Sequence, residues 1–118
     1  MNKRQQLGQL GEEIAVRHLK NLGYNILQQR YRTAQGEIDI IANYQGTLIF
    51  IEVKARTSTR YGLPSEAVTY HKQTKIRQTA LAYLQAEKPR YNDLRFDVIS
   101  LLFDTSGQHQ LEHIKNAF

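Results

Sequence analysis

The segment GEIDIIANYQGTLIFIEVKAR, residues 36–56, decides the fold. Two apolar runs flank residues 43–46, a turn signal in which Gly46 can adopt the positive φ of a tight turn. The pattern predicts a β-hairpin. Its second strand, residues 47–55, is apolar on both faces before it becomes charged, which is typical of a central strand covered on both sides.

The hairpin carries three carboxylates and an amine. Glu37 and Asp39 are two residues apart, as are Glu52 and Lys54, so each pair projects from one face of its strand. A two-residue turn places Asp39 opposite Glu52, and Glu37 opposite Lys54. A four-residue loop slides the pairing but keeps the shared face, whereas a three-residue loop puts the pairs on opposite faces. We adopt the shared face, because such a patch has a chemical use.

Oxygen-rich sites of Asp and Glu select hard cations, and Mg²⁺ is usually held by one or two carboxylates together with water and substrate phosphate. Asp39 and Glu52 would form such a site for Mg²⁺ or Mn²⁺. Lys54 is placed to orient an attacking water or to neutralise charge on a scissile phosphate. The chemistry indicated is metal-dependent phosphodiester hydrolysis. The simpler interpretation is surface decoration, since Glu–Lys pairs across a hairpin contribute only about 0.2 to 1 kcal/mol.

Before the hairpin, apolar residues recur at three- and four-residue steps over residues 5–22 and predict an amphipathic helix. Gly11 falls inside the apolar stripe and Glu12 on its edge. The helix can therefore approach a sheet closely while Glu12 reaches past the contact, as a second shell or a second metal position together with Glu37. Residues 24–32 predict a strand near a sheet edge.

After the hairpin, residues 57–64 form a polar loop, and a helix is expected over residues 66–86, capped by Ser65 or Thr69. Lys72 falls on its inward stripe, where its amine either meets carboxylates or phosphate, or extends to solvent. Residues 94–103 predict a strongly apolar strand and residues 110–115 a weaker one, in which His113 is expected to be solvated. The order α-β-β-β-α-β-β indicates a mixed five-stranded sheet flanked by helices.

The remaining basic residues near the carboxylates are candidates for binding nucleic acid. They supply phosphate contacts without sequence specificity. The candidates are Arg56, Arg60, Lys72, Lys75 and Arg77. The net charge of +5 and the pI near 9.6 suit a polyanionic partner.

Length and composition bound the remaining alternatives. The 118 residues predict one domain, 1–118. The absence of cysteine excludes disulfides and thiolate metal sites. The chain shows neither a signal-peptide pattern nor an apolar run of membrane-spanning length, so we expect a cytoplasmic protein.

The motifs resemble a known family. Gly8 and Glu12 in the first helix, GEID at 36–39, IEVKAR at 51–56 and FDV at 96–98 resemble the YraN family of small bacterial proteins over essentially the whole chain. That family is similar to the PD-(D/E)XK, restriction-endonuclease-like nucleases, and in layout to archaeal Holliday junction resolvases. Ile38 stands where the nuclease superfamily has proline, a change that removes no ligand.

The resemblance implies a PD-(D/E)XK nuclease-like domain acting on DNA, with branched or structured DNA as the substrate class. It implies Asp39 and Glu52 as metal ligands, Lys54 as the catalytic lysine, and Glu12 as the helix carboxylate that completes the site. Glu37 is a second-shell candidate. Resolvases act as dimers, which suggests a homodimer, although nothing in the sequence marks a two-fold interface.

The sequence also allows two functions other than a nuclease. One is a nucleic-acid-binding module that keeps the fold without turnover, which predicts salt-sensitive binding and no metal-dependent cleavage. The other is a protein-interaction role, which requires the apolar strand at residues 94–103 to be an exposed edge.

Overall fold

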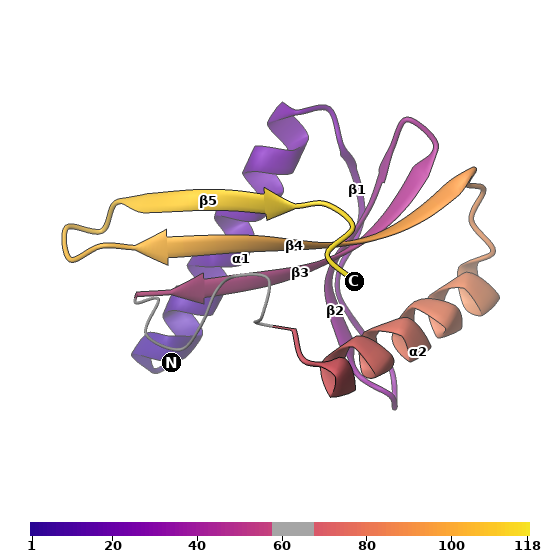
Figure 1. Cartoon of the computed structure of the whole chain (residues 1–118), viewed down its shortest axis with the longest axis horizontal. Coiled ribbons are helices and arrows are strands. Elements are labelled where there is room, and N and C mark those ends of the chain that lie inside the picture. Colours follow the sequence, from indigo (N-terminus) through magenta and orange to yellow (C-terminus); the bar gives the residue numbers. More distant parts are fainter. Residues whose placement is uncertain (58–67) are drawn as a thin grey trace.

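The computed structural model, described here over residues 1–57 and 68–118, contains two helices and five strands in the expected order (Figure 1). The expected helix over residues 5–22 and strand over residues 24–32 are confirmed, with bounds that differ by one or two residues. The elements are α1 (Lys3–Asn21), β1 (Asn25–Arg32), β2 (Glu37–Tyr44), β3 (Thr47–Arg56), α2 (Tyr70–Glu87), β4 (Asp93–Phe103) and β5 (His109–Ile114).

The start of the second helix differs from the prediction. Residues 66 and 67 lie outside the described residues, and α2 begins at Tyr70 rather than at Glu66. Thr69 has an extended backbone, and its hydroxyl accepts a hydrogen bond from the Lys72 amide at 3.3 Å. Thr69 is therefore the N-cap, one of the two caps that the sequence allowed.

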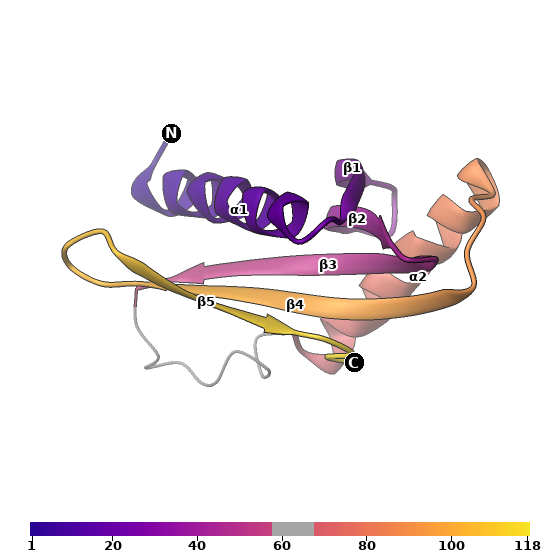
Figure 2. The same ribbon diagram turned by 90° about the horizontal axis from the view of Figure 1, so that it is seen from above.

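The strands form one mixed sheet in the order β1-β2-β3-β4-β5, in which only the β3–β4 pair is parallel. Helix α1 covers one face and α2 the other, as the view from above shows (Figure 2). The expected five-stranded α/β architecture is confirmed, with β1 at an edge and β3 in the centre. Strand β4 lies between β3 and β5, so it is not the exposed edge that a protein-interaction role required.

The hairpin has the two-residue turn. Gln45 and Gly46 both have positive φ, 51° and 83°, and Tyr44 pairs with Thr47. Turns of this kind match the right-handed twist of the flanking strands. The pairing of β2 with β3 runs as far as Ile40 opposite Ile51. Asp39 therefore stands at the next position, where β2 begins to separate from β3.

Strand β2 also changes the facing of its side chains at Asp39. Ile40 packs in the apolar cluster beneath α1, whereas Ile38, which strict alternation would place on the same face, packs in the cluster beneath α2. The change coincides with Arg30 of β1, which lies opposite Asp39 and has a φ of 52°. This bend opens the end of β2 toward both helices.

Helix α1 lies close to β3, as its glycine predicts. A Cβ placed on Gly11 would lie 2.8 Å from the Cβ of Ala55, which is closer than real side chains approach. Gly11 is buried, and the neighbouring Glu12 is only partly exposed. The short distance between helix and strand is what brings the Glu12 carboxylate to the end of β2. Within the described residues, neither helix combines the length and the hydropathy of a membrane-spanning segment.

Candidate active site

Where the two hairpin strands separate, the side chain of Asp39 accepts a backbone hydrogen bond in place of a backbone carbonyl. Its Oδ2 accepts a hydrogen bond from the amide of Val53 at 2.8 Å, across from β2 to β3. The Asp39 carboxylate also contacts that of Glu52, the residue before Val53. The predicted meeting of the two carboxylates is therefore present in the fold.

The surroundings of Asp39 disfavour its charge. Burial, followed by the hydrogen bond and the negative charge of Glu52, raises the pKa of Asp39 to about 8, while the Val53 amide acts in the opposite direction. Glu37 adds a smaller repulsion. In the absence of a cation, the carboxylate pair therefore retains a proton near neutral pH.

Glu12 joins the cluster from α1. Burial raises its pKa, the Asp39 charge raises it further, and Arg30 opposes the shift. Arg30 Nε lies 2.8 Å from Glu12 Oε2 in an ion pair between β1 and α1. The expectation that the first helix brings a carboxylate toward the hairpin patch is met.

Lys54 lies on the other side of the carboxylates. Burial lowers the pKa of Lys54, the positive charge of Lys72 lowers it further, and Glu52 and Asp39 oppose both effects. Lys72 is solvent-exposed but close to Lys54, so α2 contributes a second amine to the cluster. The alternative in which Lys72 extends to solvent is confirmed, and its side chain contacts the Lys54 amine rather than a carboxylate.

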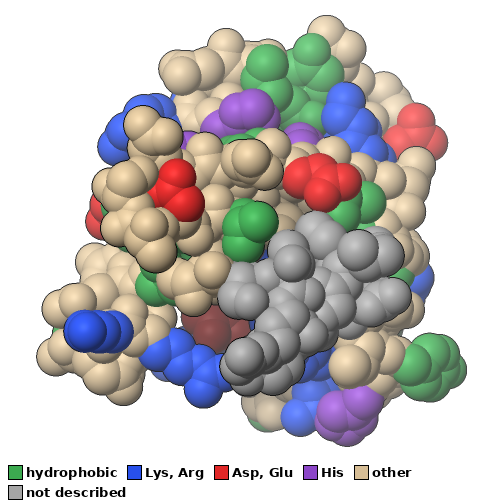
Figure 3. All heavy atoms as spheres, turned by 60° about the vertical axis from the view of Figure 1, so that its left-hand side comes forward, with side chains coloured by type: hydrophobic (Ala, Val, Ile, Leu, Met, Phe, Trp, Pro, Cys, Tyr) green, Lys and Arg blue, Asp and Glu red, His purple; other side chains and the backbone are tan. Residues whose placement is uncertain are grey.

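A pocket of about 170 Å³ is lined by Glu52, Lys54 and Lys72 of this cluster, whereas Asp39 and Glu12 are not among its lining residues. It lies between the end of β2, β3 and the first turns of α2, and its charged lining residues are Glu37, Glu52, Lys54, Lys72 and Lys75. In the space-filling view, an acidic side chain lies recessed in a hollow of the surface with Lys and Arg side chains on its rim (Figure 3). Glu37 also pairs with Arg32 at 3.2 Å on the exposed side of β2.

The other basic candidates have different positions. Arg77 points away from the pocket, with its guanidinium 4.8 Å from the centre of the Phe96 ring and 5.5 Å from that of Phe118. It covers an aromatic pair rather than lying beside the carboxylates, contrary to the expectation. Arg56 is the half-buried last residue of β3, and Arg60 lies outside the described residues.

A larger hollow of about 410 Å³ lies at the turn between β4 and β5. Its one carboxylate, Asp104, already accepts bonds from Ser106 Oγ at 2.6 Å and from the Ser106 and Gln108 amides. Those bonds hold the turn together and lower the pKa of Asp104. The smaller pocket at α2 is the better candidate, because its charged groups converge on it from three elements.

The donor set fits a hard cation with few protein ligands. Among residues 1–57 and 68–118, no group of three or more Asp, Glu or His side chains is arranged to hold a metal ion by itself. Asp39 and Glu52 nevertheless form the two-carboxylate set that Mg²⁺ commonly uses, with water and substrate oxygens as its other ligands. Burial and the neighbouring Glu52 both disfavour the charge of Asp39 and raise its pKa, and a bound cation would offset both effects.

The shifted pKa predicts how the metal-free protein responds to pH. A carboxyl whose pKa is raised on folding binds its proton more tightly in the folded state, so stability falls as the pH rises from about 4 to about 8. Asp39→Asn keeps an acceptor for the Val53 amide but carries no charge. We expect this variant to be more stable than the wild type at pH 8, by up to about 5 kcal/mol at about 1.36 kcal/mol per pKa unit, and no more stable at pH 4. Urea unfolding with EDTA present, at both pH values, measures the difference.

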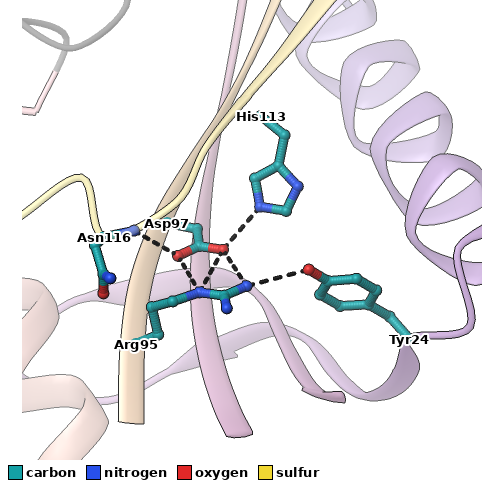
Figure 4. A network of polar contacts seen from close by, with 5 residues as sticks. All are labelled: Tyr24, Arg95, Asp97, His113 and Asn116. Carbon is teal, nitrogen blue, oxygen red and sulfur yellow. Dashed lines mark hydrogen bonds and ion pairs between the residues drawn. The ribbon is translucent and has the colours of Figure 1, made fainter. Parts of the chain in front are cut away.

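The sequence did not predict a buried ionic network on β4 (Figure 4). Asp97, fully buried, accepts bonds from Arg95 Nε at 2.9 Å, His113 Nε2 at 2.7 Å and the Asn116 amide at 3.1 Å. Arg95 in turn donates to the Tyr24 hydroxyl at 3.1 Å. The prediction that His113 is solvated was wrong: its side chain is only 9% exposed. The available signal was an aspartate inside the apolar run LRFDVISLLF.

The fold and the cluster define a small α/β protein with carboxylates and lysines gathered at the end of a central hairpin. Residues 11–101 match the family model described as "Uncharacterised protein family UPF0102". The chain is 47% identical to a UPF0102 protein of Alkaliphilus oremlandii over the full length of both. It is 45% identical to one of Geotalea daltonii, over 99% of this chain and 92% of the relative. A UPF0102 protein of Dictyoglomus thermophilum is 40% identical over both full lengths. The protein belongs to the UPF0102 family, and the expected YraN membership is confirmed.

Proposed function

We propose that this protein is a Mg²⁺- or Mn²⁺-dependent nuclease that hydrolyses phosphodiester bonds in DNA. The observation that carries the proposal is the meeting of Asp39, Glu52 and Lys54 where β2 separates from β3. Burial and neighbours of like charge raise the pKa of Asp39 and lower that of Lys54, so both groups are shifted toward their neutral forms. Such shifted groups in a pocket are characteristic of catalytic sites.

Each group has a role in the proposed reaction. Asp39 and Glu52 would hold the cation, which supplies polarisation of the phosphate and a more acidic water. A water oxygen forms a bond to phosphorus while the bond to the leaving sugar oxygen breaks; the water loses a proton and the leaving oxygen gains one. Lys54 neutralises charge that develops on the phosphate. Lys72 and Lys75 bind neighbouring phosphates of the strand.

The substrate class rests on the resemblance to resolvase-like nucleases and on charge. The net charge of +5 favours a polyanion. Branched or otherwise structured DNA is the proposed substrate, cut by a homodimer so that two sites act on two strands. A binding module without turnover is the second candidate, because Lys72 and Lys75 would bind phosphate whether or not cleavage follows.

The direct test is cleavage of a panel of duplex, single-stranded, flap and four-way-junction DNA with Mg²⁺, with Mn²⁺ and with EDTA. We expect metal-dependent cleavage by the wild type and none above background by Asp39→Ala or Glu52→Ala. Cleavage that survives both substitutions refutes the assignment, since it must then come from another site or another protein. Salt-sensitive binding without cleavage by any preparation selects the binding module instead.

A further inference from the structure

Arg30 reaches the carboxylate cluster from the edge strand. Its Nε contacts Glu12 Oε2 at 2.8 Å, and its side chain is 52% exposed while that of Glu12 is 18% exposed. The negative charges of Glu37 and Asp39 also lie close enough to raise the pKa of Arg30. One guanidinium thus interacts with three of the four carboxylates in the cluster.

The backbone of Arg30 is unusual for a strand residue. Its φ of 52° lies in the left-handed region, which residues other than glycine rarely adopt. Arg30 stands opposite Asp39, at the bend where β2 changes its facing. Backbone conformations of this kind persist where the surroundings enforce them, and they are frequent at functional sites.

We propose that Arg30 is a positioning residue, which holds the Glu12 carboxylate against Asp39 and so orients Asp39 for the divalent cation that Asp39 and Glu52 would hold. This inference rests on the proposed metal-dependent function and assigns a role to a residue outside the expected site. Arg30 acts through Glu12 and needs no contact with the substrate.

Two effects of removing Arg30 oppose each other. Loss of its positive charge favours cation binding, but the guanidinium is half exposed, so the effect is screened to about twofold. Loss of the contact frees the Glu12 side chain, which contacts the proposed metal ligand Asp39. Loss of the partners that orient a metal ligand typically weakens metal affinity by about 10- to 100-fold. Orientation therefore outweighs charge, and Arg30→Ala should bind metal more weakly.

The experiment is calorimetric titration of the metal-free protein with Mn²⁺ at pH 8, with circular dichroism to verify folding. The variants are Arg30→Ala, Arg30→Lys, Glu12→Ala and the Arg30→Ala/Glu12→Ala double variant. Arg32→Ala is the matched control, because it removes a neighbouring strand cation that pairs with Glu37 at 3.2 Å rather than with Glu12.

We expect Arg30→Ala to weaken Mn²⁺ affinity by about tenfold, and Arg32→Ala to stay within about twofold of the wild type. Arg30→Lys should fall between, because an ammonium keeps the charge but not the guanidinium geometry. Arg30→Lys is the variant used for the test if Arg30→Ala does not fold. In the Glu12→Ala background, Arg30→Ala should cause no further loss and should change the affinity by at most about twofold, the effect of its charge.

Wild-type affinity in Arg30→Ala, or a full second loss in the double variant, overturns the role of Arg30 and leaves the nuclease proposal standing. No Mn²⁺ binding by the wild type overturns both.

Discussion

Asp97→Ala is expected to lower the free energy of unfolding by about 3 to 5 kcal/mol, because it leaves Arg95 and His113 nearly buried without their shared carboxylate. The carboxylate accepts from both side chains and from the Asn116 amide, and so joins β4, β5 and the C-terminal turn. Urea unfolding at pH 7, followed by circular dichroism, measures the loss. Glu112→Ala, an exposed change on β5, is the control and should stay within about 0.5 kcal/mol of the wild type.

The same network predicts sensitivity to acid. Burial by itself would raise the pKa of Asp97, but the bonds from His113, Arg95 and the Asn116 amide outweigh it and hold the pKa below its usual value. A carboxyl with a lowered pKa stabilises the fold fully above its unfolded pKa, near 3.8, and loses that contribution as the pH falls further. A loss below about 1 kcal/mol in Asp97→Ala would show that the network is replaceable by water or by rearrangement.

Lys54→Ala is expected to reduce the rate constant of DNA cleavage by about 10²- to 10³-fold, the usual effect of removing one group that stabilises transition-state charge. Folding should be unaffected, since the change also removes an amine whose charge is disfavoured by burial and by Lys72. Single-turnover cleavage at saturating protein isolates this step from binding.

Two lysines provide the controls for that measurement. Lys20→Ala removes the same charge from an exposed position in the last turn of α1 and should leave cleavage unchanged. Lys72→Ala should weaken DNA binding and reduce the slope of log affinity against log salt by about one, with a smaller effect on the rate at saturation. If Lys54→Ala cleaves at the wild-type rate, the lysine is a binding residue and the proposed chemistry loses its cationic partner.

The hairpin could be predicted because local chemistry decides it. Strand alternation puts Glu52 and Lys54 on one face, and the Gln45-Gly46 pair suits a two-residue turn. The change of facing of β2 at Asp39 is not predicted by alternation. The short distance between α1 and β3 was predictable for a similar reason, since Gly11 on an apolar stripe has no other evident use.

Other features depend on partners that are remote along the chain. His113 is enclosed because Asp97, sixteen residues earlier, contacts it at 2.7 Å. Arg77 covers Phe96 and Phe118 because the C-terminal residues fold back onto β4, where the Ala117 amide donates to the Phe96 carbonyl. No periodicity within a single helix or strand predicts such contacts, because each requires two segments to be packed first.

By itself the sequence determined the order of the elements, the presence of the hairpin and the residue types at its charged end, because these follow from alternation, turn chemistry and helical periodicity. The structure decided between the turn lengths that the sequence left open. Only the tertiary structure decided what surrounds that end. The pairing of β2 with β3 ends at Ile40 and Ile51, α1 brings Glu12 with its guanidinium partner Arg30, and α2 brings Lys72. The chemistry of the site could not be predicted from spacing because it depends on packing. Burial and the charges of neighbouring elements raise the pKa of Asp39 to about 8, and both arise only when the elements are packed together.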